Sequence, residues 1–153
     1  MSTAQPPPSF EIGRDGPSVL LVGVDGSPTS LRAAAYAAGL ARRQSSRLAA
    51  VHVRTTPTLA GLSAYAAPYL DASTDQVAED VRRQIEAGAA YVGVEVEWFV
   101  AKGEPYAEIT RVATEIAADA VLVGASASAG HKLVGSLAVR LVRAGKWPVT
   151  VVP

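Results

Sequence analysis

The chain has 153 residues, 49% of them hydrophobic, which suits one domain with a substantial core. Fourteen basic residues balance 14 acidic ones, so the sequence predicts neither nucleic acid nor an anionic membrane as a partner. The absence of cysteine excludes disulfides, thiolate chemistry and cysteine-based metal sites, and only His52 and His131 could supply an imidazole, so we expect no metal site.

Residues 1–17 are predicted to form a flexible N-terminal arm. They include Pro6-Pro7-Pro8 and few core-forming side chains. They also lack an apolar signal core, and no apolar run in the chain approaches the roughly 20 residues that cross a bilayer. We therefore expect a cytoplasmic protein whose folded domain spans residues 18–153.

The domain is predicted to begin with a buried strand and an alanine-rich helix. Residues 18–24 form a nearly continuous aliphatic run, typical of a strand buried on both faces of a parallel sheet. Asp25 ends the run in a turn. Ser27 is a candidate helix cap and Pro28 suits the first helical position, so the sequence predicts a helix over 28–43.

A second apolar strand is predicted over 47–53. His52 lies inside it, where a core or hydrogen-bonded histidine is expected rather than a catalytic base. Residues 58–71 show no clear period and are predicted to be a long flap over one end of the sheet. Ser73 starts a capping-box spacing, which predicts an amphipathic helix to about Ala90 with a charged outer face.

Three further strands and two helices complete the predicted domain. Residues 94–101 alternate and then become apolar, as expected of a strand near the sheet edge. A helix begins around Glu104 and leads into a fourth strand over 120–123. After a loop of small residues, a last helix begins at Gly135, and a final strand covers 148–152.

This alternation predicts a single α/β domain with a doubly wound, five-stranded parallel sheet and helices on both faces. Ligands of such sheets bind at the carboxyl ends of strands, where the strand order reverses. Asp25, the turn after Val53 and the loop after Gly124 all follow predicted strands. We therefore expect these three segments to converge on one crevice.

The loop between the fourth strand and the last helix predicts an anion site. Residues 121–136 run from an apolar strand through small residues to Gly135-Ser136. Small residues let a ligand approach the backbone, and a helix start offers unpaired N–H groups and the positive end of its dipole. Phosphate is the natural ligand, and a tight turn that binds nothing is the alternative.

Other nucleotide and catalytic motifs fit poorly. Only Gly23 and Gly26 follow the first strand, so the dinucleotide fingerprint is incomplete, and no P-loop spacing occurs. Asp25 lacks the neighbouring acids that hold Mg²⁺ in a phospho-receiver. Ser126 comes close to a nucleophile elbow, but no acid separates it from His131, the only later histidine. No catalytic residue is therefore predicted.

Several stretches together resemble the universal stress protein family. Residues 22–30 (Val-Gly-Val-Asp-Gly-Ser-Pro-Thr-Ser) are similar to its first strand and turn, 51–53 to its second strand, 103–124 to its third helix and fourth strand, and 135–152 to the close of its fold. The resemblance covers 18–153. It implies an adenine-nucleotide α-hydrolase-like sheet, usually a homodimer, with an adenine-nucleotide site in some members and none in others.

The resemblance also implies site residues. Asp25 and Val53 would meet adenine and ribose, and the family's glycine loop would hold the phosphates. ATP-binding members show Gly-x-x-Gly, nine residues, then Gly-Ser or Gly-Thr, whereas here Ala127 replaces the second glycine and seven residues precede Gly135. The full set implied is Asp25, Val53, Val123, Gly124, Ser126, Ala127, Gly135, Ser136 and Leu137.

The expected function is therefore that of a non-enzymatic stress-response regulator or sensor that binds ATP weakly, with or without Mg²⁺. Homodimerisation is expected through the apolar C-terminal strand, which would otherwise leave an open sheet edge. Two alternatives remain: a dimeric interaction module without nucleotide, and a slow nucleotide hydrolase, for which Asp25 is the only candidate base.

Overall fold

The computed structural model describes residues 16–55, 67–126 and 134–153, with the backbone alone for 67–73. Residues 1–15 of the predicted arm (1–17), residues 58–66 of the predicted flap (58–71) and Ala127 lie outside the described residues. The elements alternate along the chain: β1 (Val19–Val24), α1 (Pro28–Gln44), β2 (Arg47–Arg54), α2 (Ala67–Tyr91), β3 (Val96–Lys102), α3 (Pro105–Glu115), β4 (Ala120–Gly124), α4 (Ser136–Ala144) and β5 (Val149–Val152).

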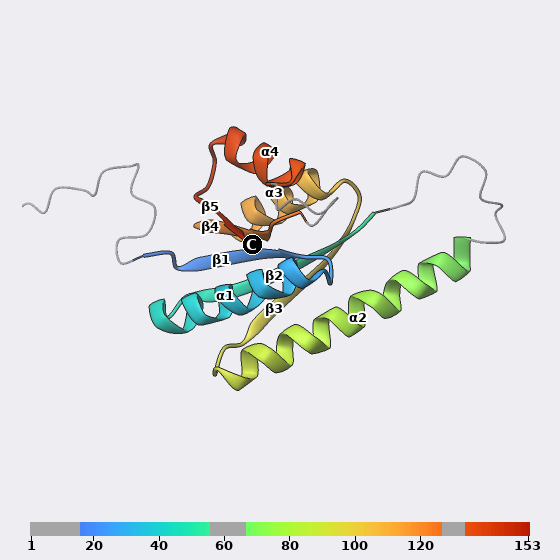
Figure 1. Ribbon diagram of the computed structural model, residues 1–153, viewed down its shortest axis with the longest axis horizontal. Helices are drawn as coiled ribbons and strands as arrows, with labels where there is room; N and C mark the ends of the chain where they lie inside the picture. Colours follow the sequence, from blue (N-terminus) through green and yellow to red (C-terminus); the bar gives the residue numbers. More distant parts are fainter. Residues whose placement is uncertain (1–15, 56–66, 127–133) are drawn as a thin grey trace, which may run out of the picture.

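The five strands form one parallel sheet in the order β3-β2-β1-β4-β5. Helices α1 and α2 cover one face and α3 and α4 cover the other (Figure 1). The chain moves outward from β1 to β2 and β3, then returns to add β4 and β5 on the other side. The strand order thus reverses between β1 and β4. The predicted doubly wound, five-stranded fold is confirmed.

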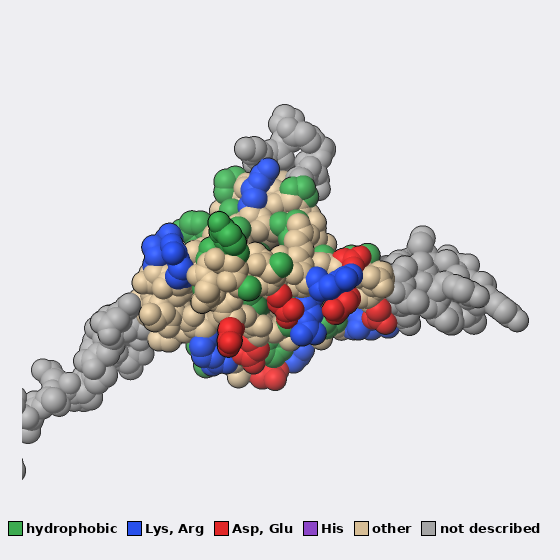
Figure 2. All heavy atoms as spheres, turned by 90° about the horizontal axis from the view of Figure 1, so that it is seen from below, with side chains coloured by type: hydrophobic (Ala, Val, Ile, Leu, Met, Phe, Trp, Pro, Cys, Tyr) green, Lys and Arg blue, Asp and Glu red, His purple; other side chains and the backbone are tan. Residues whose placement is uncertain are grey.

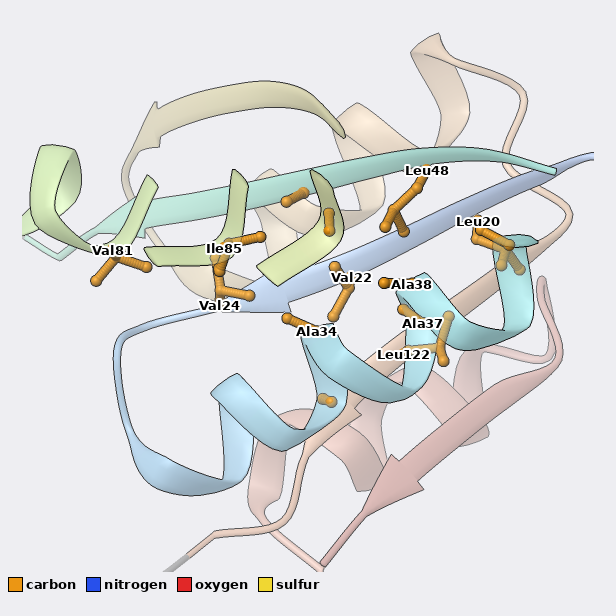
Figure 3. Close-up of a cluster of buried hydrophobic side chains, with 14 residues drawn as sticks. Leu20, Val22, Val24, Ala34, Ala37, Ala38, Leu48, Val81, Ile85 and Leu122 are labelled. Carbon is orange, nitrogen blue, oxygen red and sulfur yellow. The ribbon is translucent and has the colours of Figure 1, made fainter. Parts of the chain in front are cut away.

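Two hydrophobic layers hold the helices on the sheet. Leu20 and Val22 of β1 point toward α1 and α2, with Ile85 of α2 among their neighbours (Figure 3). Leu21 points the other way, into the layer under α3 and α4. Helix α1 buries only small side chains, which let its axis lie close to the sheet. These are Ser30, Ala33, Ala34, Ala37, Ala38 and Ala41.

Helix α2 begins earlier than the sequence predicted. It starts at Ala67 rather than Ser73, so residues 67–71 are helical and that part of the predicted flap is wrong. Pro68 lies in the first turn, where its missing N–H group breaks no helical hydrogen bond. The predicted charged outer face is confirmed (Figure 2). No helix in the described part of the chain is long and apolar enough to cross a membrane.

Strand β3 begins two residues later than the predicted Val94. Gly93 adopts a left-handed φ of 77°, and its N–H donates to the Ala90 carbonyl at 3.0 Å. The Val94 N–H donates to the Ala89 carbonyl at 2.9 Å. This pair of bonds is the Schellman motif that ends helices, so Val94 belongs to the end of α2 and cannot join the sheet.

Helix α3 ends with the same motif, but with alanine at the left-handed position. Ala117 has a φ of 52° and is exposed. Its N–H donates to the Thr114 carbonyl at 3.2 Å, and the Ala118 N–H donates to the Ala113 carbonyl at 2.8 Å. A left-handed conformation costs an L-residue roughly 1–2 kcal/mol, a cost that glycine avoids. Ala117 is therefore a strained residue at the end of α3.

We predict that Ala117→Gly raises the free energy of unfolding by about 1 kcal/mol, because it removes this strain at the cost of one methyl group. Ala35→Gly is the matched control, since Ala35 is also exposed but lies in the middle of α1. There glycine should lower the free energy of unfolding by about 0.5–1 kcal/mol. Urea denaturation measures both, and a loss of stability in Ala117→Gly would contradict the prediction.

Candidate functional site

A cleft of about 550 Å³ lies at the carboxyl ends of β1, β2 and β4. This is the place where the strand order reverses, as expected for ligands of doubly wound sheets. The first turns of α1, α3 and α4 complete its lining. Eight of the nine predicted site residues line this cleft: Asp25, Val53, Val123, Gly124, Ser126, Gly135, Ser136 and Leu137. The ninth, Ala127, lies outside the described residues.

The turn that carries Asp25 is organised by hydrogen bonds. The Ser27 N–H donates to Asp25 Oδ1 at 2.9 Å, and Ser27 Oγ accepts from the Ser30 N–H at 3.2 Å, which caps α1. Gly26 supplies the left-handed φ of 85° between them. The predicted cap at Ser27 is confirmed, and the Asp25 carboxylate is presented at the cleft by a turn rather than by a regular strand.

Asp25 is negatively charged at neutral pH. Burial would raise the pKa of its carboxyl, but hydrogen bonds from Ser27 and Ser30 outweigh that effect and hold the pKa below its usual value. It is the only ionisable side chain among the cleft-lining residues that the structure describes. An ionised carboxylate only accepts hydrogen bonds. Asp25 therefore suits ligand hydroxyl or amine groups and repels phosphate.

Gly124 has a packing role that its sequence position does not reveal. A Cβ there would lie 2.6 Å from the Ser30 nitrogen and 2.6 Å from the Thr29 carbonyl carbon. Those atoms are backbone, so they cannot move aside as a flexible side chain would. Only glycine allows the end of β4 to touch the first turn of α1. This contact joins two parts of the cleft lining, the end of β4 and the start of α1.

The start of α4 presents to the cleft backbone N–H groups that have no acceptor within the helix. Gly135 is its N-cap, with φ −63° and ψ 159°, and it has no side chain of its own to cap this end. The first helical bond runs from the Val139 N–H to the Gly135 carbonyl at 3.1 Å. The N–H groups of Ser136, Leu137 and Ala138 therefore have no acceptor within the helix. Together with the helix dipole they make this end of the cleft attractive to an anion.

Several lining residues were not predicted. Thr29 and Ser30 come from the first turn of α1, and Pro105 and Ile109 come from α3. The α1 residues could have been found, because a helix that follows β1 directly must start at the same sheet edge as Asp25. Nothing local marks Pro105 and Ile109 as lining residues, since they look like an ordinary helix start and an ordinary core position.

Glu104 caps α3, as its predicted place at a helix start implied. Its carboxylate accepts hydrogen bonds from the Tyr106 N–H at 3.2 Å and the Ala107 N–H at 3.0 Å, and it also binds the Arg140 guanidinium of α4 at 2.6 Å. The bond from Arg140 does most to hold the pKa of Glu104 below its usual value. Glu104 is therefore ionised at neutral pH.

His52 is not among the residues that line the cleft. It is 6% exposed, its Nδ1 is 3.0 Å from the Val24 carbonyl oxygen, and its ring stacks on Trp98 at a centroid distance of 6.4 Å. The expected hydrogen-bonded core histidine is confirmed. His131 lies outside the described residues. Among those described, no group of three or more metal-binding side chains is arranged around one point.

Solved structures share this fold. Universal stress protein UspA from Lactobacillus plantarum is 24% identical, with 89% of this chain and 97% of that chain covered and a TM-score of 0.75. A universal stress protein in complex with cAMP is 23% identical, with 90% and 97% covered and a TM-score of 0.69. An Arabidopsis thaliana member with AMP bound is 16% identical, with 89% and 91% covered and a TM-score of 0.66.

Sequence comparison gives the same family. Universal stress protein YxiE of Bacillus subtilis (strain 168) is 30% identical over 143 residues, which cover 87% of this chain and 97% of that protein. The model of the universal stress protein family matches residues 18–153, which contain the whole five-stranded sheet and all the cleft-lining residues described above. The chain therefore belongs to the universal stress protein family.

Proposed function

We propose that the cleft binds an adenine nucleotide weakly, and that the protein is a non-enzymatic regulator that responds to this ligand. One observation carries the proposal: eight residues predicted from separate stretches of sequence line a single cleft. The complexes of relatives with cAMP and AMP support an adenine nucleotide as the ligand. The cytoplasmic location stays a prediction.

The charges in the cleft favour one orientation of the nucleotide. The ionised Asp25 and the apolar Val53 suit the ribose hydroxyls and the adenine ring, while the start of α4 suits phosphate. Reversing the ligand would place phosphate against a carboxylate. We therefore propose that the nucleoside lies toward Asp25 and the phosphates toward Gly135 and Ser136.

The proposed affinity for ATP is low. Ala127 and the shortened loop replace the glycine spacing of ATP-binding members. Each lost charge-assisted hydrogen bond costs roughly 1.5–3 kcal/mol, so two losses would move a micromolar site toward the millimolar range. Of the cleft-lining side chains that the structure describes, only Asp25 could contribute a charge to Mg²⁺. Any Mg²⁺ accompanying ATP would therefore be held mainly by the phosphates.

We favour a regulator over a slow hydrolase because of Asp25. A general base works best when its pKa lies near the operating pH, whereas the pKa of Asp25 is held below even its usual acidic value. It is also a hydrogen-bond acceptor within its own turn. Its proposed role is therefore to hold the nucleoside rather than to activate water, and phosphate release from ATP would contradict this.

We further propose that β5 pairs with its copy in a homodimer. It is one of two edge strands, and it contains only valine and threonine, whereas the other edge, β3, carries Glu97 and Lys102. Charges on an edge strand discourage pairing. The charges on β3 therefore favour β5 as the edge that pairs.

We predict that isothermal titration calorimetry on the unmodified protein gives a high-micromolar to millimolar dissociation constant for ATP. Asp25→Asn should weaken ATP and adenosine by a similar factor, since both carry the nucleoside, while the asparagine oxygen can still accept from the Ser27 N–H. Submicromolar ATP binding would show that the altered loop is fully competent. No heat at millimolar ATP would favour the interaction module.

We predict that Ser136→Pro weakens ATP about 10- to 100-fold and leaves adenosine unchanged, because it removes one N–H donor from the phosphate end. Proline suits this first helical position, and Gly135 already has the extended backbone that proline requires of its predecessor. The helix should therefore persist, as circular dichroism can check. Ser136→Ala is the control that removes only the hydroxyl. Equal ATP affinity in all three proteins would contradict the proposed phosphate position.

We predict that Val151→Pro converts the dimer to a monomer at tens of micromolar, as measured by light scattering. The Val121 N–H donates to Pro148 and the Ala125 N–H donates to Val152, so alternation directs the N–H of Val151 away from β4. Proline at position 151 removes the N–H group that would bond to the partner strand, and it leaves the hydrogen bonds between β5 and β4 intact. Val151→Ala controls for lost packing and should remain dimeric. A monomeric unmodified protein would overturn the proposed dimer.

A further inference from the structure

Arg140 links α4 to the start of α3 through two contacts. Its guanidinium nitrogens lie 2.6 and 3.4 Å from the two carboxylate oxygens of Glu104, and its guanidinium carbon lies 4.2 Å from the centre of the Tyr106 ring. Glu104 is at the same time bonded to the N–H groups of Tyr106 and Ala107. One cluster of three side chains therefore joins the cap of α3 to the side of α4.

The helices that Arg140 joins both line the cleft. Pro105, next to Glu104, contributes to the lining from α3, and Ser136 contributes from α4. Ser136 and Arg140 are four residues apart and lie on the same face of α4, and helical side chains lean toward the N-terminus. The link therefore lies beside the turn whose N–H groups are the proposed phosphate donors.

We propose that Arg140 is a positioning residue for the phosphate end of the cleft: by binding Glu104 and stacking on Tyr106 it fixes the first turn of α4 relative to α3. This inference rests on the proposed nucleotide site. Donors held in place before a ligand arrives bind it more tightly, because less freedom is lost on binding. Arg140 thus supports phosphate affinity without touching the ligand.

A direct contact between Arg140 and phosphate is the competing explanation, and the two differ in the sign of one effect. If Arg140 acts through Glu104, then Glu104→Gln weakens nucleotide binding, because the charged partner is lost. If Arg140 binds phosphate directly, then Glu104→Gln releases the guanidinium and strengthens binding. Glutamine retains an acceptor oxygen for the α3 cap, so the variant tests the charge rather than the cap.

The test is calorimetry with AMP and adenosine on the unmodified protein, Glu104→Gln, Arg140→Gln and the double variant. Arg140 and Glu104 are about half exposed, and exposed ion pairs have modest energies, so each single change should weaken AMP about three-fold. The double variant should bind AMP no more weakly than either single variant, and adenosine affinity should not change. Arg140→Lys, which keeps the charge, should recover part of the loss.

Arg111→Gln is the matched control. Arg111 also makes two ion pairs, with the partly buried Glu108 and the exposed Glu115 at 2.9 Å each, but all three residues lie in α3. Arg111→Gln removes the same charge but keeps the contact between α3 and α4, so its AMP affinity should equal that of the unmodified protein. Equal AMP affinity in Arg140→Gln and Arg111→Gln would overturn the inference, and so would tighter AMP binding by Glu104→Gln.

Amide hydrogen exchange without ligand separates this inference from the proposed function. Arg140→Gln should speed exchange about two- to five-fold at the first hydrogen-bonded amides of each helix, Tyr106 and Ala107 in α3 and Val139 in α4, and leave the Ser27-capped start of α1 unchanged. If the unmodified protein binds no AMP, the proposed function is contradicted. The exchange rates of the Arg140→Gln variant still test whether Arg140 positions these turns. Unchanged exchange at both helices would overturn that role.

Discussion

The burial of the middle of β1 is the constraint on which the other elements depend. Leu20, Leu21 and Val22 have no exposed surface, because β1 is paired on both sides and covered on both faces. Burying an aliphatic side chain of this size contributes about 1.5–3 kcal/mol. With β1 at the centre, the chain can only add strands outward on each side. The reversal of strand order, and with it the cleft, follows from that position.

The cleft itself is held open by small residues rather than by large ones. Gly124 lets β4 touch the backbone of α1 at Thr29 and Ser30, and a Cβ at Gly135 would lie 3.0 Å from the Ser126 Cβ. Larger side chains at these two glycines would fill the space or push the walls apart. The same residues therefore satisfy the packing of the fold and the approach of a ligand to the backbone, so their presence alone does not distinguish the two roles.

The strands and the convergence of the site residues could be predicted because both follow from strong local patterns. Aliphatic runs mark β1 and β2, and parallel strands bring their carboxyl ends to one edge, which places Asp25, Val53 and Gly124 together. The start of α2 was missed because residues 58–71 show no clear helical period, so Pro68 was not recognised as a first-turn proline. The start of β3 was misjudged because Val94 satisfies a strand pattern while its N–H completes a helix end.

The link between Glu104 and Arg140 had no sequence signal at all. The two residues are 36 positions apart, both are exposed, and each has an ordinary local explanation, one as a helix start and the other as a basic residue near a helix end. Pairings of this kind depend on how two helices lie on a sheet, which periodicity does not encode. Tertiary packing decides them, so they become visible only in the assembled fold.

The permanent charge of Asp25 limits the proton exchange that can accompany ligand binding. Asp25 is the only ionisable side chain among its described lining residues, and its depressed pKa keeps it charged from weakly acidic to alkaline pH. A group that does not change its protonation on binding exchanges no protons with the buffer. Across neutral pH, any protons that a nucleotide and these described residues take up or release together would therefore come from the phosphate groups of the nucleotide.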